Sequence, residues 1–486
     1  MITRQITALI FTFLATAVSV AAALLPVGQP QYDFLYDRIT YDYLHTHNGA
    51  EIITAPLWLD SAARSQLPLD LWTDNYTQQK IHLFGSIEEK FSISRGNRPS
   101  AFESLRSGFS AQPTSSFFVF GTFSLDEQKA RDPEYHGKKW RGLAGGVDQA
   151  FISYKSGNFL GILGRFSEYW GDSRSLALSS NSAMDGFSWR YRWGRLSLGY
   201  RIARIDGLSP EQDGVPQFEN RFFAAHRLDV RLSQQIRVGL YEMVVFGGPG
   251  RQMELYYLNP ILLYHASQLN EKNDDNTILG FDLTLHPRKG TRFHAELLVD
   301  DIQIDDKLQS DQEPDEIAVS GSIYQADIIS GYDLIARYER VTNRTFNQIL
   351  PRNRFTFEGR PIGSAFGNDY DRTELKVRRW MNPRWLVDLQ ILIHRQGEGR
   401  VADDWTTPWM DISGPYHETF PSGLVERTTT VAIRSAGYFK KILYFDITVG
   451  VERITNEQHR QTSAISRPFV SITLSPYLFK RLSVSD

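Results

Sequence analysis

The sequence predicts an all-β fold, a transmembrane antiparallel β-barrel of about eighteen strands with a small N-terminal periplasmic helical segment. Three observations predict it: a secretory signal at the N-terminus, strands with one apolar and one polar face, and connections that alternate in length. Zero cysteines in an exported chain means that no disulfide supports the fold. The net charge of −3 gives no basic surface for nucleic acid.

Residues 1–23 have the pattern of a signal peptide. Arg4 supplies the positive head, residues 6–20 form an apolar run, and Ala21, Ala22 and Ala23 suit signal peptidase. A permanent membrane anchor is the alternative, because the run is about long enough to span a bilayer. Since nothing basic follows the run, we predict cleavage near Ala23.

Residues 24–75 differ from the rest of the chain. The stretch 32–39 shows no period-two alternation and predicts a short helix that ends before Asn48 and Gly49. We expect this segment to be periplasmic, below the barrel or plugging it, and residues 76–486 to form the barrel.

The predicted strands have one apolar and one polar face. Within 196–202, Leu196, Leu198, Tyr200 and Ile202 alternate with Ser197, Gly199 and Arg201, and the segments 186–193, 227–232 and 443–452 repeat the pattern. A soluble sandwich would alternate as well. Segments of about ten residues that recur through most of the chain favour a membrane barrel with a lipid face and a lumen face.

Connection lengths give an independent indication. Short connections are expected at 156–157, 194–195, 235, 288–290, 328–330, 381–383 and 437–440, with long ones at 167–185, 206–225, 247–276, 303–315, 342–370, 396–424 and 452–465. Outer-membrane barrels have short periplasmic turns and long extracellular loops. A hairpin at 77–111 and a strand at 114–125 complete the count of about eighteen strands.

Two groups of side chains follow from this arrangement. Aromatic residues beside the short turns predict a periplasmic girdle at the membrane interface, made of Trp193, Trp380, Trp385, Tyr438, Phe439 and Tyr444. The lumen face is heavily charged, for example at Arg227, Asp229, Asp282, Arg378 and Asp446. These charges either pair across strands in a filled barrel or line a water-filled pore.

Several motifs resemble the capsule assembly Wzi family. They are a Gly-Arg, a Trp-Gly and a Leu-x-Leu-Ser-x-Asn within 161–187, followed in the family's order by 226–232, 239–248, 257–276, 296–305 and 359–372. The resemblance implies an occluded barrel that binds capsular polysaccharide at the cell surface. Two features depart from the family: the helical N-terminal region is shorter, and the sequence ends in Asp486 rather than an aromatic residue. The signal for the barrel-assembly machinery would then be internal.

Polysaccharide binding calls for flat aromatic faces and rigid polar groups. The loop 396–424 carries both, and its candidate binding residues are Trp405, Trp409, Tyr416, His417, Asp403, Asp404 and Asp411. The alternative for this loop is a self-packed cap over the barrel mouth. Tyr169 and Trp170 are further candidates, although they belong to the family's pattern and a structural role is favoured for them.

Other chemistry has little support in the sequence. There is no G-x-S-x-G motif, no zinc-like histidine spacing and no Gly-rich phosphate loop, so we expect no catalytic residue, metal or cofactor. The protein is expected to be a monomer in the outer membrane that binds polysaccharide and contacts membrane lipid. The alternatives are a porin-like channel for oligosaccharides and an outer-membrane hydrolase.

Overall fold

The computed structural model describes residues 24–46, 54–58, 80–94 and 100–483, with short gaps at 115, 133–134, 136, 172–174, 180–182, 213–214, 272–273, 303–311, 413–415 and 441. The predicted signal peptide and its cleavage site lie outside the described residues. No helix in the described part is long and apolar enough to cross a membrane.

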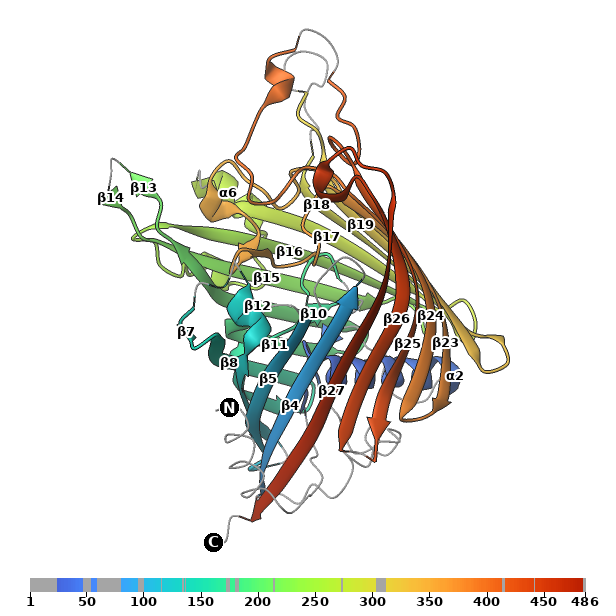
Figure 1. Cartoon of the computed structure of the whole chain (residues 1–486). Helices are drawn as coiled ribbons and strands as arrows, with labels where there is room; N and C mark the ends of the chain where they lie inside the picture. Colours follow the sequence, from blue (N-terminus) through green and yellow to red (C-terminus); the bar gives the residue numbers. More distant parts are fainter. Residues whose placement is uncertain are drawn as a thin grey trace.

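The chain forms a closed antiparallel barrel of 18 long strands, which confirms the predicted fold class (Figure 1). The strands are β4 (Lys80–Ser94), β5 (Ser100–Ala111), β6 (Phe117–Asp126), β8 (Leu143–Ser156), β9 (Phe159–Phe166), β11 (Met184–Trp193), β12 (Leu196–Leu208), β15 (Glu219–Arg231), β16 (Ile236–Pro249), β17 (Asn276–Leu285), β18 (Thr291–Asp301), β19 (Glu316–Ile329), β20 (Tyr332–Val341), β23 (Tyr370–Asn382), β24 (Trp385–Gln396), β25 (Glu426–Phe439), β26 (Leu443–Thr455) and β27 (Ile465–Ser483). The barrel closes where β27 pairs with β4, with Phe469 opposite Ser94.

Smaller elements decorate this barrel. Two-residue strands pair as β1 (Leu24–Leu25) with β3 (Leu57–Trp58), β2 (Thr54–Ala55) with β10 (Tyr169–Trp170), β13 (Glu211–Gln212) with β14 (Val215–Pro216), and β21 (Thr356–Phe357) with β22 (Arg360–Pro361), while β7 (Lys139–Trp140) pairs with β8. The helices are α2 (Pro30–Thr46), α5 (Glu127–Arg131) and α6 (Tyr264–Glu271), with 3-10 turns η1 (Tyr256–Leu258), η2 (Pro351–Asn353), η3 (Pro408–Met410) and η4 (Glu457–His459).

The strands alternate as the sequence predicts. On the outer face the apolar side chains of Leu389, Ile433 and Val449 are 49%, 56% and 50% exposed, as lipid-facing residues are in the absence of lipid. Their neighbours Asp388 and Arg434 point inward and are bonded to each other. The short turns and long loops also lie where they are expected, at opposite ends of the strands.

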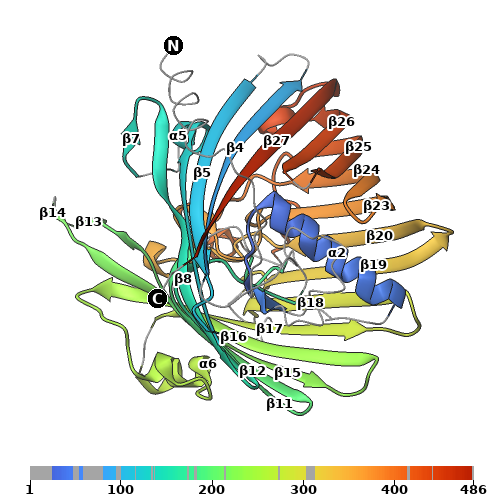
Figure 2. The same ribbon diagram turned by 90° about the horizontal axis from the view of Figure 1, so that it is seen from below.

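Helix α2 crosses the barrel opening at the end with the short turns (Figure 2). The ring of Phe34 packs edge-on against Trp380, Tyr438 and Tyr444, with ring centroids 5.2, 5.5 and 6.3 Å away. The helix predicted from the broken alternation is therefore present, and its apolar face is buried on the barrel's inner wall.

The predicted aromatic girdle is only half right. Trp193, Trp385 and Phe439 are exposed on the outer face, at 74%, 39% and 58%. The other three predicted members, Trp380, Tyr438 and Tyr444, face inward and bind the helix. The distance of a residue from a turn determines its height along the barrel axis. Its position in the alternation determines whether it lies on the inner or the outer face of the wall.

Candidate functional site

Paired charges fill much of the lumen. Arg227 bonds Asp229 and Asp282 at 2.6 and 2.5 Å, and Arg434 bonds Asp446 at 2.7 Å. Because an unpaired buried charge is costly, cross-strand pairing removes much of the penalty of a charged interior. Of the two predicted arrangements, these residues therefore adopt pairing in a filled barrel.

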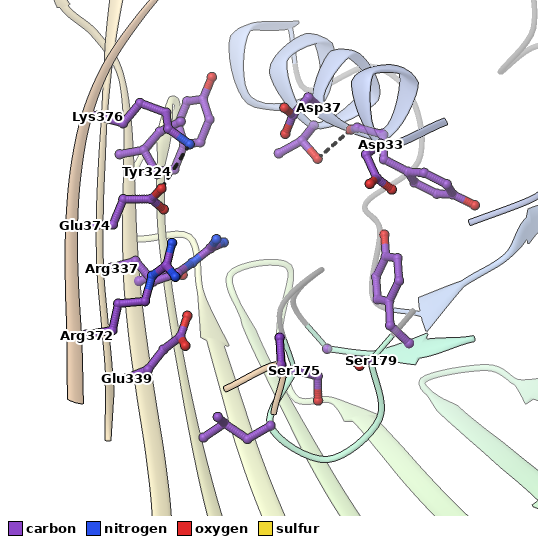
Figure 3. A pocket seen from close by; sticks show the side chains of 18 of the residues that line it. Asp33, Asp37, Ser175, Ser179, Tyr324, Arg337, Glu339, Arg372, Glu374 and Lys376 are labelled. Atoms are coloured by element: carbon purple, nitrogen blue, oxygen red, sulfur yellow. Dashed lines mark hydrogen bonds and ion pairs between the residues drawn. The ribbon is translucent and has the colours of Figure 1, made fainter. Parts of the chain in front are cut away.

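A polar cavity of about 520 Å³ remains between helix α2 and the barrel wall (Figure 3). Asp33 and Asp37 border it from the helix, and the facing wall of β20 and β23 contributes Arg337, Glu339, Arg372, Glu374 and Lys376.

Residues 175–179 close the cavity on the side away from the helix. Ser175 donates its hydroxyl to Glu296 at 2.7 Å, and the Leu176 amide donates to the same carboxylate at 2.9 Å. The cavity inside the lumen is thus bounded both by the helix and by this loop.

Tyr169 and Trp170 lie inside the barrel rather than on its surface. They are 3% and 2% exposed and pair with Ala55 and Thr54 of β2. The ring of Tyr169 packs against Tyr36 of α2 at 5.8 Å, and Trp170 donates its ring N–H to Glu168 at 3.1 Å. The two residues tie the N-terminal segment to the loop after β9.

The predicted binding loop 396–424 is partly self-packed. Trp409 is only 3% exposed, because the Arg344 guanidinium lies 4.9 Å from its ring and Tyr416 packs at 6.1 Å. Trp405 is half-buried, while Asp403, Asp404 and Asp411 are exposed. Asp403 also fixes the loop by accepting from the Arg400 amide at 2.8 Å.

A groove of about 490 Å³ opens at the end with the long loops. This rim groove is lined by residues 312–317 at the start of β19, residues 340–343 at the end of β20 and residues 416–420 of the loop before β25. It brings together two of the predicted residues, Tyr416 and His417, and leaves Trp405 and the three aspartates outside its lining.

The groove holds its polar groups in fixed positions. The Glu418 carboxylate accepts from the Asn343 amide at 3.0 Å and from Arg344 at 2.7 Å. The Arg340 guanidinium of the groove lies 3.8 Å from the centre of the Phe420 ring. A carboxylate, an amide, a guanidinium and aromatic rings therefore line one solvent-open hollow.

Sequence reasoning missed most of this lining, including Gln312, Arg340, Asn343, Glu418 and Phe420. These residues come from three separate connections, which are brought together by strand pairing such as that of Ala318 with Val341. Composition could single out the aromatic-rich loop, but no local signal marks its partners.

A second cluster joins helix α2 to the wall. The two ring nitrogens of His45 lie 3.3 Å from Asp327 and 3.0 Å from Asp333. Among the described residues this is the one His and carboxylate group close enough for a metal ion. Because each ring nitrogen already faces its own carboxylate, the geometry is that of a protonated imidazole held between two anions.

Burial by itself would lower the pKa of His45. The hydrogen bond that His45 donates to Asp333 and the negative charges of Asp333 and Asp327 outweigh burial and raise the pKa above its usual value. The proton that His45 needs to bond both carboxylates is thus favoured by its surroundings.

A closed antiparallel barrel with an apolar outer wall and a charged lumen places the chain in the class of outer-membrane β-barrel proteins. Within that class, the chain belongs to the capsule assembly Wzi family: the family model described as "Capsule assembly protein Wzi" matches residues 103–465. No curated protein sequence matches the chain.

One of the similar solved structures shows the same fold. Wzi of Escherichia coli, described as a carbohydrate-binding β-barrel of the outer membrane, superposes with a TM-score of 0.62 at 13% identity, covering 93% of this chain and 99% of that one. OccD3 of Pseudomonas aeruginosa has a TM-score of 0.46 at 11% identity, covering 82% and 91%. OpdK of the same organism has a TM-score of 0.46 at 11% identity, covering 83% and 99%.

Proposed function

We propose that this protein binds capsular or other surface polysaccharide in the rim groove, and so retains the polymer at the cell surface or assists its assembly. The observation that carries the proposal is the groove itself, which combines aromatic faces with fixed polar groups at the extracellular end of an occluded barrel. The description of Escherichia coli Wzi as a carbohydrate-binding barrel involved in group 1 capsule assembly supports it.

Each part of the groove has a role in this proposal. Tyr416, His417 and Phe420 offer ring faces to the C–H surfaces of a sugar. Glu418 and Asn343 take sugar hydroxyls, and Arg340 takes a carboxylate if the polymer is acidic. Trp405, Asp403, Asp404 and Asp411 would contact polymer that extends beyond the groove. Trp409, Tyr169 and Trp170 would shape the protein from within.

The remaining assignments follow the same picture. We propose that residues 24–75 form a periplasmic plug that includes α2, and that the protein acts as a monomer in outer-membrane lipid after insertion by the barrel-assembly machinery. Its function is binding rather than catalysis.

The double variant Tyr416→Ser, His417→Ser tests the proposal. Since stacking contacts are worth about 0.5–1.5 kcal/mol each, we expect polysaccharide affinity to fall by roughly tenfold. The measurement is co-sedimentation of the purified protein with surface polysaccharide from the source cells.

The matched control is Trp140→Ser, which removes a 61% exposed aromatic side chain from the tip of β7, outside the groove. Equal binding by the double variant, the control and the unmodified protein would rule out the rim groove as the binding site.

A further inference from the structure

Part of the barrel's outer wall is covered by the protein's own chain. Residues 250–275, which connect β16 to β17 and are here called the outer flap, pack Tyr257 and Tyr264 against Tyr200, Phe222 and Phe246. Tyr200 is outward-facing by alternation, in step with Leu196 and Leu198, and yet it is only 3% exposed. The hydroxyl of Tyr200 donates to the Tyr257 carbonyl at 3.0 Å.

The covered wall lies at the level of the hydrocarbon band. Tyr200 and Ile202 stand as many residues beyond the start of β12 as Leu389 and Ile391 stand beyond the start of β24. On β24 these positions are bare, at 49% and 41% exposure, whereas Tyr200 and Ile202 are 3% and 4% exposed. The flap therefore occupies space that lipid occupies on the other side of the barrel.

A buried carboxylate anchors the flap to the wall. Glu242 of β16 shares the outward face with Leu240 and Val244, where an ionised side chain in contact with lipid would be destabilising. It is 2% exposed, and its oxygens accept from the Tyr264 and His265 amides at 2.6 and 2.7 Å. His226 of β15 lies 3.3 Å from the same carboxylate.

Charges within the flap are also satisfied internally. Arg251 bonds Glu254 at 2.7 Å and Asp275 at 2.8 Å, and the Tyr257 hydroxyl donates to Asp275 at 2.7 Å. These charged side chains of the flap thus pair with one another.

The opposite surface of the flap exposes several large apolar side chains, beside polar ones such as Gln252 and Asn259. Its exposed side chains include Leu255, Ile261 and Leu263, at 82%, 79% and 62% exposure, and the surface continues the lipid-facing wall. We propose that the outer flap is embedded in the outer leaflet of the membrane, where these three side chains contact lipid acyl chains. The inference depends on the outer-membrane location and not on the polysaccharide proposal.

The absence of cysteine in the sequence makes the test direct. Single variants Leu255→Cys and Ile261→Cys, labelled with a fluorophore, are reconstituted into phosphatidylcholine vesicles with and without doxyl-labelled acyl chains. The control for contact with lipid is Ile433→Cys on the uncovered barrel wall, where the side chain is 56% exposed. The control for contact with water is Met410→Cys in the loop 396–424, where the side chain is 68% exposed.

We expect doxyl lipid to quench the two flap labels as strongly as the Ile433 label, and about twofold or more above the Met410 label. Aqueous iodide should quench Met410 and spare the flap. Flap labels that behave like Met410 would overturn the proposal. Shielding from iodide without doxyl quenching, growing with protein concentration, would also overturn it and point to a second copy on the flap.

A second variant tests the anchor. Glu242→Leu keeps the wall apolar and removes the acceptor of the two flap amides, so labels at Leu255→Cys and Ile261→Cys should become accessible to iodide while the Ile433→Cys label is unchanged. Continued doxyl quenching with no gain in iodide access would contradict the anchoring role of Glu242. The comparison of the flap labels with the two control labels tests the membrane contact of the flap even if the Glu242→Leu variant does not fold.

Discussion

At the residue scale, the inward charges work as pairs rather than as isolated groups. Asp388 is fully buried and bonds Arg378 at 2.8 Å, and Arg434 lies 3.4 Å from the same carboxylate. Arg378 also reaches Asp37 of helix α2 at 2.9 Å. One carboxylate thus bonds two cations of the wall, and one of these cations also bonds helix α2.

Asp388→Ala should be strongly destabilising, because it leaves two guanidinium groups short of an acceptor. Removing one partner of a buried pair costs about 3–5 kcal/mol. The measurement is the free energy of unfolding in denaturant, on protein refolded in detergent. The control is Glu127→Ala, which breaks an exposed pair with Arg131 and should cost at most about 1 kcal/mol. Similar losses in the two variants would mean that the lumen pairs contribute no more than surface pairs.

At the element scale, the two ends of helix α2 are attached to the barrel wall by different kinds of interaction. Near its start Phe34 enters an aromatic cluster, and near its end His45 bridges Asp327 and Asp333. The first attachment is independent of pH, whereas the second requires a protonated imidazole. As the pH rises, the C-terminal half of the helix should therefore detach from the barrel wall before the N-terminal half does.

The sign of the pH effect follows from the raised pKa of His45. The attachment is fully present below the ordinary histidine pKa of about 6.5 and is lost as the pH rises through the raised value. Hydrogen exchange in the C-terminal half of α2, corrected for intrinsic rates, should then be faster in mildly alkaline than in mildly acidic buffer. His45→Gln should abolish the difference, and a difference that persists in this variant would exclude His45 as its source.

The sequence predicted this helix but not its contacts. The lack of alternation in 32–39 is a local signal, so the element could be recognised from it. Its partners Trp380, Tyr438 and Tyr444 lie several hundred residues later, and their position beside short turns suited a membrane girdle equally well. Glu242 was missed for a similar reason, because an outward carboxylate in a strand gives no sign that another segment covers it.

At the scale of the whole molecule, two elements inside the barrel favour a binding protein over a channel. Helix α2 crosses the opening at the short turns, and residues 175–179, held by Glu296, lie within the lumen farther along. The fold class and strand number were predictable from alternation and loop lengths. The sequence could not predict whether the lumen is open. The same charged residues suit either a pore or a set of ion pairs until their partners are known.

Planar bilayers containing the unmodified protein should show no single-channel steps. Removal of one closure should still leave the lumen closed, so Phe34→Asp alone and Glu296→Ala alone are expected to be silent. The two changes combined should produce conductance. Steady steps from the unmodified protein, blocked by added saccharide, would instead support transport of oligosaccharides.

The pairing of β27 with β4 has a consequence for how the molecule is assembled. This seam joins the last strand of the barrel to the first, so the sheet cannot close before the whole chain has been delivered. Until then the sheet is open along this seam, so we expect the inward charges to be able to exchange partners. Sealing the seam last lets the buried pairs be sorted while mistakes are still reversible, and enclosure then makes the chosen partners permanent.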